Sequence, residues 1–165
     1  KTLLELGTGS GAISISIAQE NKDCFIFATD ISIKSILVAK QNAEKFCCEN
    51  IIFLNHDWNN EWLFPQVDYL ISNPPYVDKE ATTGKEEGIW HEPEKALFSK
   101  DKGLSDLKLI LSKGKNFLNE NGKVYLEHAP DQYEELNKFA VKNGYLNFSN
   151  LNDLNGDKRV SIYQC

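Results

Sequence analysis

The tetrapeptide Asn73-Pro74-Pro75-Tyr76 contains the residue types that are best suited to chemistry in this chain. It follows the apolar run 67–70, which is typical of a buried strand, and prolines end a strand because they cannot donate to a sheet. Pro74 also holds the residue before it in an extended conformation. We therefore expect a stiff loop that presents carbonyl oxygens and the Asn73 amide beside an aromatic ring, an arrangement suited to a planar group with an NH2. A plain strand-ending turn is the alternative, since Asn-Pro is a common loop dipeptide.

A second candidate site lies near the start of the chain, in Gly7-Thr8-Gly9-Ser10-Gly11. Residues 3–6 read as a short strand and residues 12–18 as a helix, so this segment joins the two. Glycines let the backbone turn tightly and approach a ligand, and a helix start offers N–H groups. The spacing also fits the dinucleotide pattern G-x-G-x-x-A. Glu5 favours another ligand, because a carboxylate there would repel a pyrophosphate and attract an ammonium group.

Acidic residues follow the next two predicted strands. Strand 25–29 ends at Asp30, and an acid at the tip of the second strand is the usual acceptor for ribose hydroxyls. Its other reading is an acid that precedes a helix. After strand 51–54, Asp57 could accept a hydrogen bond from the exocyclic amine of an adenine, with Trp58 beside the ring. A solvated loop acid and a packing indole explain the same two residues.

The remaining pattern alternates helices and strands. Residues 77–102 are the least regular, and we expect a loop that covers a site or is mobile. The expected helix faces are Ile33, Ile36, Leu37, Ala43 and Cys47, then Leu104, Leu107, Ile110, Leu111 and Leu118, and then Tyr133, Leu136, Phe139 and Ala140. The expected later strands are 123–127, with His128 at its end, and 146–148 and 160–163, with a turn at 155–157.

Strands that alternate with helices predict an α/β fold with a doubly wound, mainly parallel sheet. In such sheets ligands bind at the carboxyl ends of the strands. The candidate residues all follow predicted strand ends: the glycine turn 7–11, Asp30, Asp57, 73–76 and 127–128. We therefore expect them to meet at one edge of the sheet.

Composition narrows the class of protein. The chain has 165 residues, 41% of them hydrophobic and 25% charged, which is ordinary for one globular domain. No apolar run is long enough to span a membrane. The net charge of −6 argues against long duplex nucleic acid as a direct partner. The four cysteines and three histidines lack metal spacing, so we expect no metal and reduced thiols in the cytoplasm.

The motif Glu5-x-Gly7-x-Gly9-x-Gly11 with Asp30 resembles the cofactor half of class I S-adenosylmethionine-dependent methyltransferases. Asn73–Tyr76 resembles the subset that methylates NH2 groups on planar systems. The release factor glutamine methyltransferases (HemK/PrmC type) are the most similar, and the likeness covers nearly the whole chain. Further blocks resemble that family: Thr29–Ser32 with Ala39 and Asn42, Glu92-Pro93, Ala96-Leu97, Gly103-Leu104, Leu126–His128 with Gln132, Asp153 with Asp157, and Arg159-Val160.

The resemblance implies a class I methyltransferase fold, a Rossmann-like, mostly parallel sheet of seven strands with an antiparallel last strand. It implies S-adenosylmethionine as the cofactor and the glutamine of a release factor's Gly-Gly-Gln loop as the substrate. The cofactor residues would be Glu5, Gly7, Thr8, Gly9 and Gly11 at the methionine end, Asp30 at the ribose, Asp57 and Trp58 at the adenine, and also Ile31 and Asn73. The catalytic residues would be Asn73, Pro74 and Tyr76, and the substrate contacts would add Pro75, Glu92 and Pro93.

The family also has an N-terminal helical domain that helps to grip the release factor. Since this chain opens at the first strand, we expect residues 1–165 to be the catalytic domain alone, which binds cofactor but turns over a whole release factor poorly. Three alternatives stay open at this point. They are a DNA or RNA amino-methyltransferase that uses the same loop on adenine or guanine, a cofactor-binding module without catalysis, and an NAD-linked oxidoreductase.

Overall fold

The computed structural model describes residues 1–78, 98–101 and 103–165. A seven-stranded sheet has the order β3-β2-β1-β4-β7-β9-β8. Its strands are β1 (Thr2–Leu6), β2 (Phe25–Asp30), β3 (Ile51–Asn55), β4 (Val67–Ser72), β7 (Leu118–Glu127), β8 (Asn147–Asn152) and β9 (Lys158–Gln164). β1 pairs in parallel with β2 and β4, β2 pairs in parallel with β3, and β8 and β9 are antiparallel. The predicted fold class is therefore confirmed.

The chain divides into two compact parts. The first part comprises residues 1–73 and 116–123, and the second part comprises residues 74–115 and 124–165. Strand β7 contributes to both, because its first six residues belong to the first part and its remaining residues to the second.

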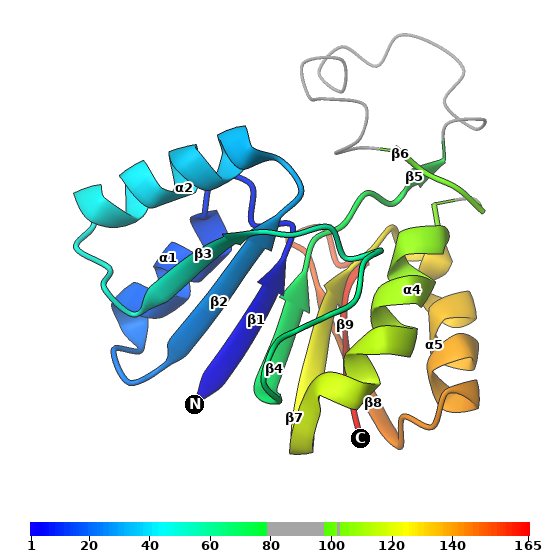
Figure 1. Ribbon diagram of the computed structural model, residues 1–165. Helices are drawn as coiled ribbons and strands as arrows, with labels where there is room; N and C mark the ends of the chain where they lie inside the picture. The colour runs from blue at the N-terminus through cyan, green and yellow to red at the C-terminus, as the bar shows by residue number, and fades with distance from the viewer. Residues whose placement is uncertain (79–97, 102) are drawn as a thin grey trace, which may run out of the picture. The chain divides into compact units, whose positions relative to one another are not determined.

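The first part contains helices α1 (Ala12–Glu20) and α2 (Ile33–Lys45), which lie next to each other along β2 and β3 (Figure 1). Small and branched apolar side chains fill the space between these elements, including Leu3, Ile15, Ala18, Ile26, Ala28 and Ala43. The register pairs the last residue of β1 with the ends of β2 and β4, and the last residue of β2 with that of β3. Four carboxyl ends therefore meet at one edge, as parallel pairing requires.

The buried face of α2 differs from the predicted one. Ile36, Ala39 and Ala43 are buried, whereas Ile33 and Leu37 are 56% and 54% exposed. The alanines turn inward because their small side chains let α2 approach α1, and this rotates the branched residues outward. Cys47 was also assigned to this face, but it lies beyond the helix end, with φ of 53° and an exposed side chain.

The second part contains helices α4 (Ser105–Gly114) and α5 (Tyr133–Lys142), which lie side by side (Figure 1). Two short strands, β5 (Val77–Asp78) and β6 (Phe98–Ser99), pair in parallel within the stretch expected to be irregular. A 3-10 turn, η3 (Pro130–Gln132), leads into α5. No helix among the described residues is both long enough and apolar enough to cross a membrane.

The prediction that Leu118 continues the α4 face is wrong. α4 ends at Gly114, the 3-10 turn η2 (Lys115–Phe117) follows, and Leu118 is the first residue of β7. The face of α5 is confirmed at Leu136 and Ala140, which are buried. The two closing strands are longer than predicted, and their turn contains Gly156 at φ of 90°.

Candidate active site

The glycine turn after β1 is fixed to neighbouring elements through the main chain. The N–H groups of Gly7 and Thr8 both donate to the carbonyl of Thr29 at the end of β2, at 2.9 and 2.8 Å. From α2, the Asn42 side-chain amide donates to the carbonyl of Ser10 at 2.9 Å. Sequence reasoning marked Asn42 only as part of a matching block, and the structure gives it this contact.

The last two glycines of the turn have different surroundings. Gly11 begins α1 with φ of 84°, and a Cβ there would lie 3.0 Å from Ile15 Cδ1 and 3.1 Å from Ala39 Cβ. A side chain at Gly11 would therefore crowd Ile15 and Ala39, in addition to the strain of a positive φ. A Cβ at Gly9 would meet nothing within 4 Å. The main chain at Gly9 is thus open to close approach by a ligand.

Glu5 lies beneath this turn and is 1% exposed. Its Oε2 accepts a hydrogen bond from Thr8 Oγ1 at 2.6 Å and another from Ser14 Oγ. Burial raises the pKa of the Glu5 carboxyl, and the two hydroxyl donors oppose that rise. The observed role of Glu5 is to join the turn to α1, and its contact with a ligand stays a prediction.

Asp30 is the last residue of β2 and lies at the same edge of the sheet. Its Oδ2 accepts from the Gly9 amide at 2.9 Å, and its Oδ1 accepts from the Ser32 amide at 2.8 Å. Since an ionised carboxylate has about four acceptor positions, both oxygens can accept again. The second bond also fits the alternative reading of an acid that precedes a helix. Asn55, which sequence reasoning missed, donates its side-chain amide to the carbonyls of Asp30 and Ile31, both at 2.9 Å.

Asp57 and Trp58 follow β3. Asp57 Oδ1 accepts from the main-chain and side-chain nitrogens of Asn59, both at 2.8 Å, which is the behaviour of a loop acid. The Trp58 ring packs on the glycine turn, because a Cβ at Gly7 would lie 3.1 Å from its Cζ3. The predicted adenine contacts of both residues stay predictions.

The loop after β4 has one exposed amide between buried neighbours. Asn73 is exposed, whereas Pro74 and Pro75 are buried. Ser72 Oγ donates to the Leu6 carbonyl at 2.8 Å, which joins the end of β4 to the end of β1. Because Asn73 follows this fixed point and precedes two prolines, its main chain has little freedom.

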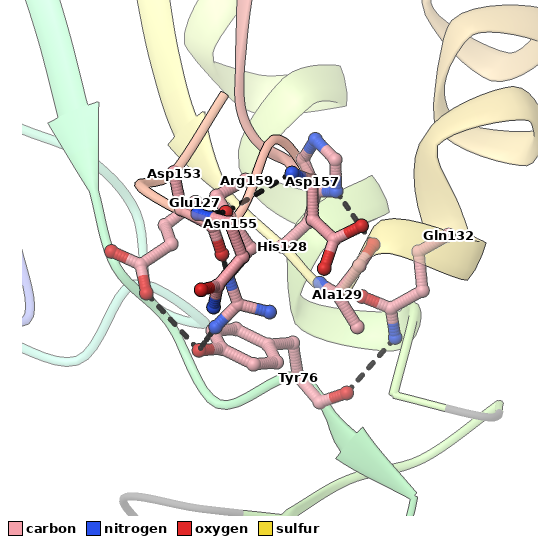
Figure 2. Close-up of polar contacts among 9 residues, drawn as sticks. All are labelled: Tyr76, Glu127, His128, Ala129, Gln132, Asp153, Asn155, Asp157 and Arg159. Carbon is pink, nitrogen blue, oxygen red and sulfur yellow. Dashed lines mark hydrogen bonds and ion pairs between the residues drawn. The ribbon is translucent and has the colours of Figure 1, made fainter. Parts of the chain in front are cut away.

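In the second part, the Tyr76 hydroxyl lies between opposite charges (Figure 2). It donates to Glu127 Oε1 at 3.0 Å and accepts from Arg159 Nη2 at 3.0 Å. Burial and the Glu127 charge raise the pKa of the Tyr76 phenol, and the Arg159 charge opposes them. The sequence placed Glu127 and Arg159 in matching blocks but gave them no role.

The main chain of Tyr76 is also fixed. Gln132 Nε2 donates to the Tyr76 carbonyl at 2.9 Å, and Gln132 Oε1 accepts from the Ala129 amide at 2.9 Å. Gly103 has φ of 79°, and a Cβ there would lie 2.0 Å from the Tyr76 carbonyl oxygen. Only glycine fits at this point, which explains the block Gly103-Leu104 in physical terms.

His128 follows β7 and is fully buried. Its Nδ1 lies 2.7 Å from the Ala129 carbonyl and therefore donates, so Nε2 accepts from Ser161 Oγ at 2.8 Å. Burial lowers the pKa of the imidazole, in agreement with this neutral form. Among the described residues, no group of three or more His, Cys, Asp or Glu side chains could bind a metal ion. Glu92 and Pro93, predicted to contact substrate, lie outside the described residues.

Comparisons with known proteins find methyltransferases that are similar to this chain. A release factor glutamine methyltransferase of Escherichia coli (strain K12) is 32% identical over 160 residues, which cover 97% of this chain and 58% of that protein. A bifunctional methyltransferase of Rickettsia felis is 37% identical over 163 residues, covering 98% of this chain and 31% of that protein. The chain therefore spans less than two thirds of the length of these relatives.

A solved methyltransferase of Pyrococcus furiosus has the same fold, with a TM-score of 0.73 at 20% identity over 99% of this chain and 74% of that one. The family model described as the methyltransferase small domain matches residues 1–136. That match includes the glycine turn, Asp30 and the Asn73–Tyr76 loop. The resemblance found in the motifs is confirmed, and this chain belongs to the methyltransferase small domain family.

Proposed function

We propose that this chain transfers a methyl group from S-adenosylmethionine to the side-chain amide of the glutamine in a release factor's Gly-Gly-Gln loop. The observation that carries the proposal is the exposed Asn73 amide at the end of β4, followed by two buried prolines. The names of the relatives that match nearly the whole chain support the choice of substrate. We therefore propose a release factor, and not long duplex nucleic acid, as the partner of this chain.

The described residues of the first part fit S-adenosylmethionine. The turn is open at Gly9, and both Asp30 oxygens can accept hydroxyl groups. When it is ionised, the Glu5 carboxyl beneath the turn would favour an ammonium group over a pyrophosphate. When bound, S-adenosylmethionine supplies a methyl group on a positively charged sulfur. The proposed binding residues are Glu5, Gly7, Thr8, Gly9 and Gly11 at the methionine end, Asp30 at the ribose, Asp57 and Trp58 at the adenine, and also Ile31 and Asn73.

A glutamine amide nitrogen is a weak nucleophile because its lone pair is delocalised into the carbonyl. In the proposed mechanism, the Asn73 side-chain oxygen and the Pro74 carbonyl each accept one N–H of that amide. Two acceptors fix the nitrogen in place and stabilise the positive charge that grows on it. The Tyr76 ring packs on the flat amide, and Pro75, with Glu92 and Pro93, completes the substrate contacts.

The proposed reaction needs no general base before the methyl transfer. A nitrogen–carbon bond forms as the sulfur–carbon bond breaks, and the electron pair of the broken bond stays on sulfur. The nitrogen then has a positive charge and an acidic proton, which passes to solvent. Asn73 and Pro74 contribute by position and by their fixed dipoles, and this is where we expect the rate enhancement to arise.

The test follows radiolabelled methyl from S-adenosylmethionine into three acceptors offered separately: release factor, DNA and RNA. The proposal predicts label on the release factor and none on a release factor whose Gly-Gly-Gln glutamine is replaced by alanine. A high release factor concentration is used, so that weak docking does not hide transfer. Label on DNA or RNA alone would instead support an amino-methyltransferase, for which the Asn73–Tyr76 loop would contact a flipped base. Calorimetric binding of the donor with no label anywhere would support a non-catalytic module.

A further inference from the structure

We propose that Glu127 and Arg159 are positioning residues, which together set the orientation of the Tyr76 ring. This inference rests on the proposed function, in which that ring packs on the substrate amide. Neither residue needs to touch the substrate for this role, because both act on Tyr76, Glu127 through the phenol hydroxyl and Arg159 through the hydroxyl and the ring (Figure 2).

The two hydrogen bonds at the hydroxyl have fixed directions. A carboxylate can only accept and a guanidinium can only donate, so the Tyr76 O–H must donate to Glu127 while its oxygen accepts from Arg159. Both bonds measure 3.0 Å. Turning the Tyr76 side chain about its Cα–Cβ bond would carry the hydroxyl away from both charge-assisted bonds, each stronger than a neutral one, so the two bonds hold the hydroxyl end of the ring in place.

Arg159 contacts the ring as well as the hydroxyl. Its Cζ lies 5.5 Å from the Tyr76 ring centroid, within the range of a cation–π interaction. Its Nε lies 4.0 Å from Asp153 Oδ2. Asp153 is itself fixed by the turn between β8 and β9, because its Oδ1 accepts from the amides of Asn155 and Asp157 at 2.9 and 3.0 Å. The hairpin turn thus orients Arg159, and Arg159 orients Tyr76.

The main chain of Tyr76 is fixed by other residues. Gln132 binds its carbonyl oxygen, and Gly103 leaves room for that carbonyl. These contacts do not involve the phenol. Changes at Glu127 or Arg159 should therefore alter the ring orientation while the backbone of the loop stays in place, which separates this role from a general effect on folding.

The first test measures the ionisation of Tyr76 by NMR on tyrosine labelled with carbon-13 at Cζ, with the signal assigned by its loss in Tyr76→Phe. The charged groups that face the hydroxyl are Glu127 from β7, Arg159 from β9 and, behind Arg159, Asp153. Glu127→Gln removes a negative charge and should lower the pKa of Tyr76, and Arg159→Gln removes a positive charge and should raise it. Lys158→Gln and Glu134→Gln make the same changes in charge at exposed residues. They are the matched controls and should leave the pKa of Tyr76 unchanged.

The second test is a double-mutant cycle on methyl transfer to the release factor. Glu127→Gln and Arg159→Gln should each lower kcat about tenfold, the scale of losing one charge-assisted bond, with donor affinity unchanged. In a Tyr76→Phe background Glu127→Gln should have little further effect, because the hydroxyl through which Glu127 acts is gone, whereas Arg159→Gln should keep the part of its effect that comes from its contact with the ring.

The two tests separate this inference from the proposed function. A Tyr76 pKa that moves in neither variant, or a loss of kcat from Glu127→Gln that is as large in the phenylalanine background, would overturn the positioning role. If the pKa moves as predicted but no methyl reaches the release factor, the positioning of the ring stands and the proposed substrate is wrong.

Discussion

The two parts of the molecule fix their candidate residues in different ways. In the first part the glycine turn is fixed mainly through its own main-chain groups: the N–H groups of Gly7 and Thr8 donate to the Thr29 carbonyl, and the Gly9 N–H donates to the Asp30 side chain. In the second part Tyr76 is fixed by the side chains of Glu127, Gln132 and Arg159. The first arrangement leaves an open backbone surface for a ligand, and the second fixes one ring.

This difference predicts different responses to mutation. A site made from main-chain groups tolerates most side-chain changes and fails where a Cβ or a lost acceptor disturbs the turn. A site made from a side-chain network fails at each member, and its members are coupled.

Asn73→Ala should lower methyl transfer by about 10²–10³, or roughly 3–4 kcal/mol, the scale of losing one preorganised partner of a transition state. Donor affinity, measured by calorimetry, should fall far less than turnover, because only one of the proposed donor contacts is removed and the turn and Asp30 are intact. Asn73→Asp should keep partial activity that rises with pH as the carboxyl ionises, since an ionised acceptor favours the developing cation. Full activity in Asn73→Ala would contradict the catalytic role and show that this loop only ends the strand.

Gly103→Ala should destabilise the protein by roughly 2–4 kcal/mol, since the new Cβ would overlap the Tyr76 carbonyl in addition to the strain of a positive φ. Gly156→Ala is the matched control. Its φ is 90°, but a Cβ there meets nothing within 4 Å, so the cost should be only about 1 kcal/mol. Urea denaturation measures both values. Equal costs would show that the carbonyl of Tyr76 is free to move away.

Asp30→Ala should weaken S-adenosylmethionine binding by roughly 1.5–3 kcal/mol, the range for hydrogen bonds to a charged group. The variant removes the proposed ribose acceptor and the bond to the Gly9 amide together. Asp23→Ala, at an exposed acid before β2, is the control and should bind the donor normally. Calorimetry with an unchanged Kd for Asp30→Ala would reject the ribose role.

Glu5→Gln should change stability in a pH-dependent way. Because the pKa of Glu5 is raised in the folded state, the folded chain favours the protonated carboxyl. That contribution is fully present below the ordinary pKa of a glutamate and is lost as pH rises through the raised value. The wild type should therefore lose stability relative to Glu5→Gln over this interval. A constant difference in unfolding free energy across it would contradict the raised pKa.

Much of the first part could be predicted from the sequence because its signals are local. The glycine spacing, Asp30 at a strand tip and the prolines after β4 lie where the pattern placed them. The network around Tyr76 could not be derived in this way, since residues 76, 103, 127, 132 and 159 meet only in the folded chain. The predicted helix faces were wrong at Leu37 and Leu118. Periodicity does not show that the side of a helix with small alanines faces the core, or that a 3-10 turn ends a helix.

The position of the transferred methyl group tests the central claim most directly. A release factor labelled with nitrogen-15 in its glutamine side-chain amides is incubated with this chain and S-adenosylmethionine that has a carbon-13 methyl group. We predict a one-bond carbon–nitrogen coupling at the Gly-Gly-Gln glutamine, which should build up about 10²–10³ times more slowly in the reaction with Asn73→Ala. Carbon-13 on the release factor without that coupling, or at another residue, would contradict the account.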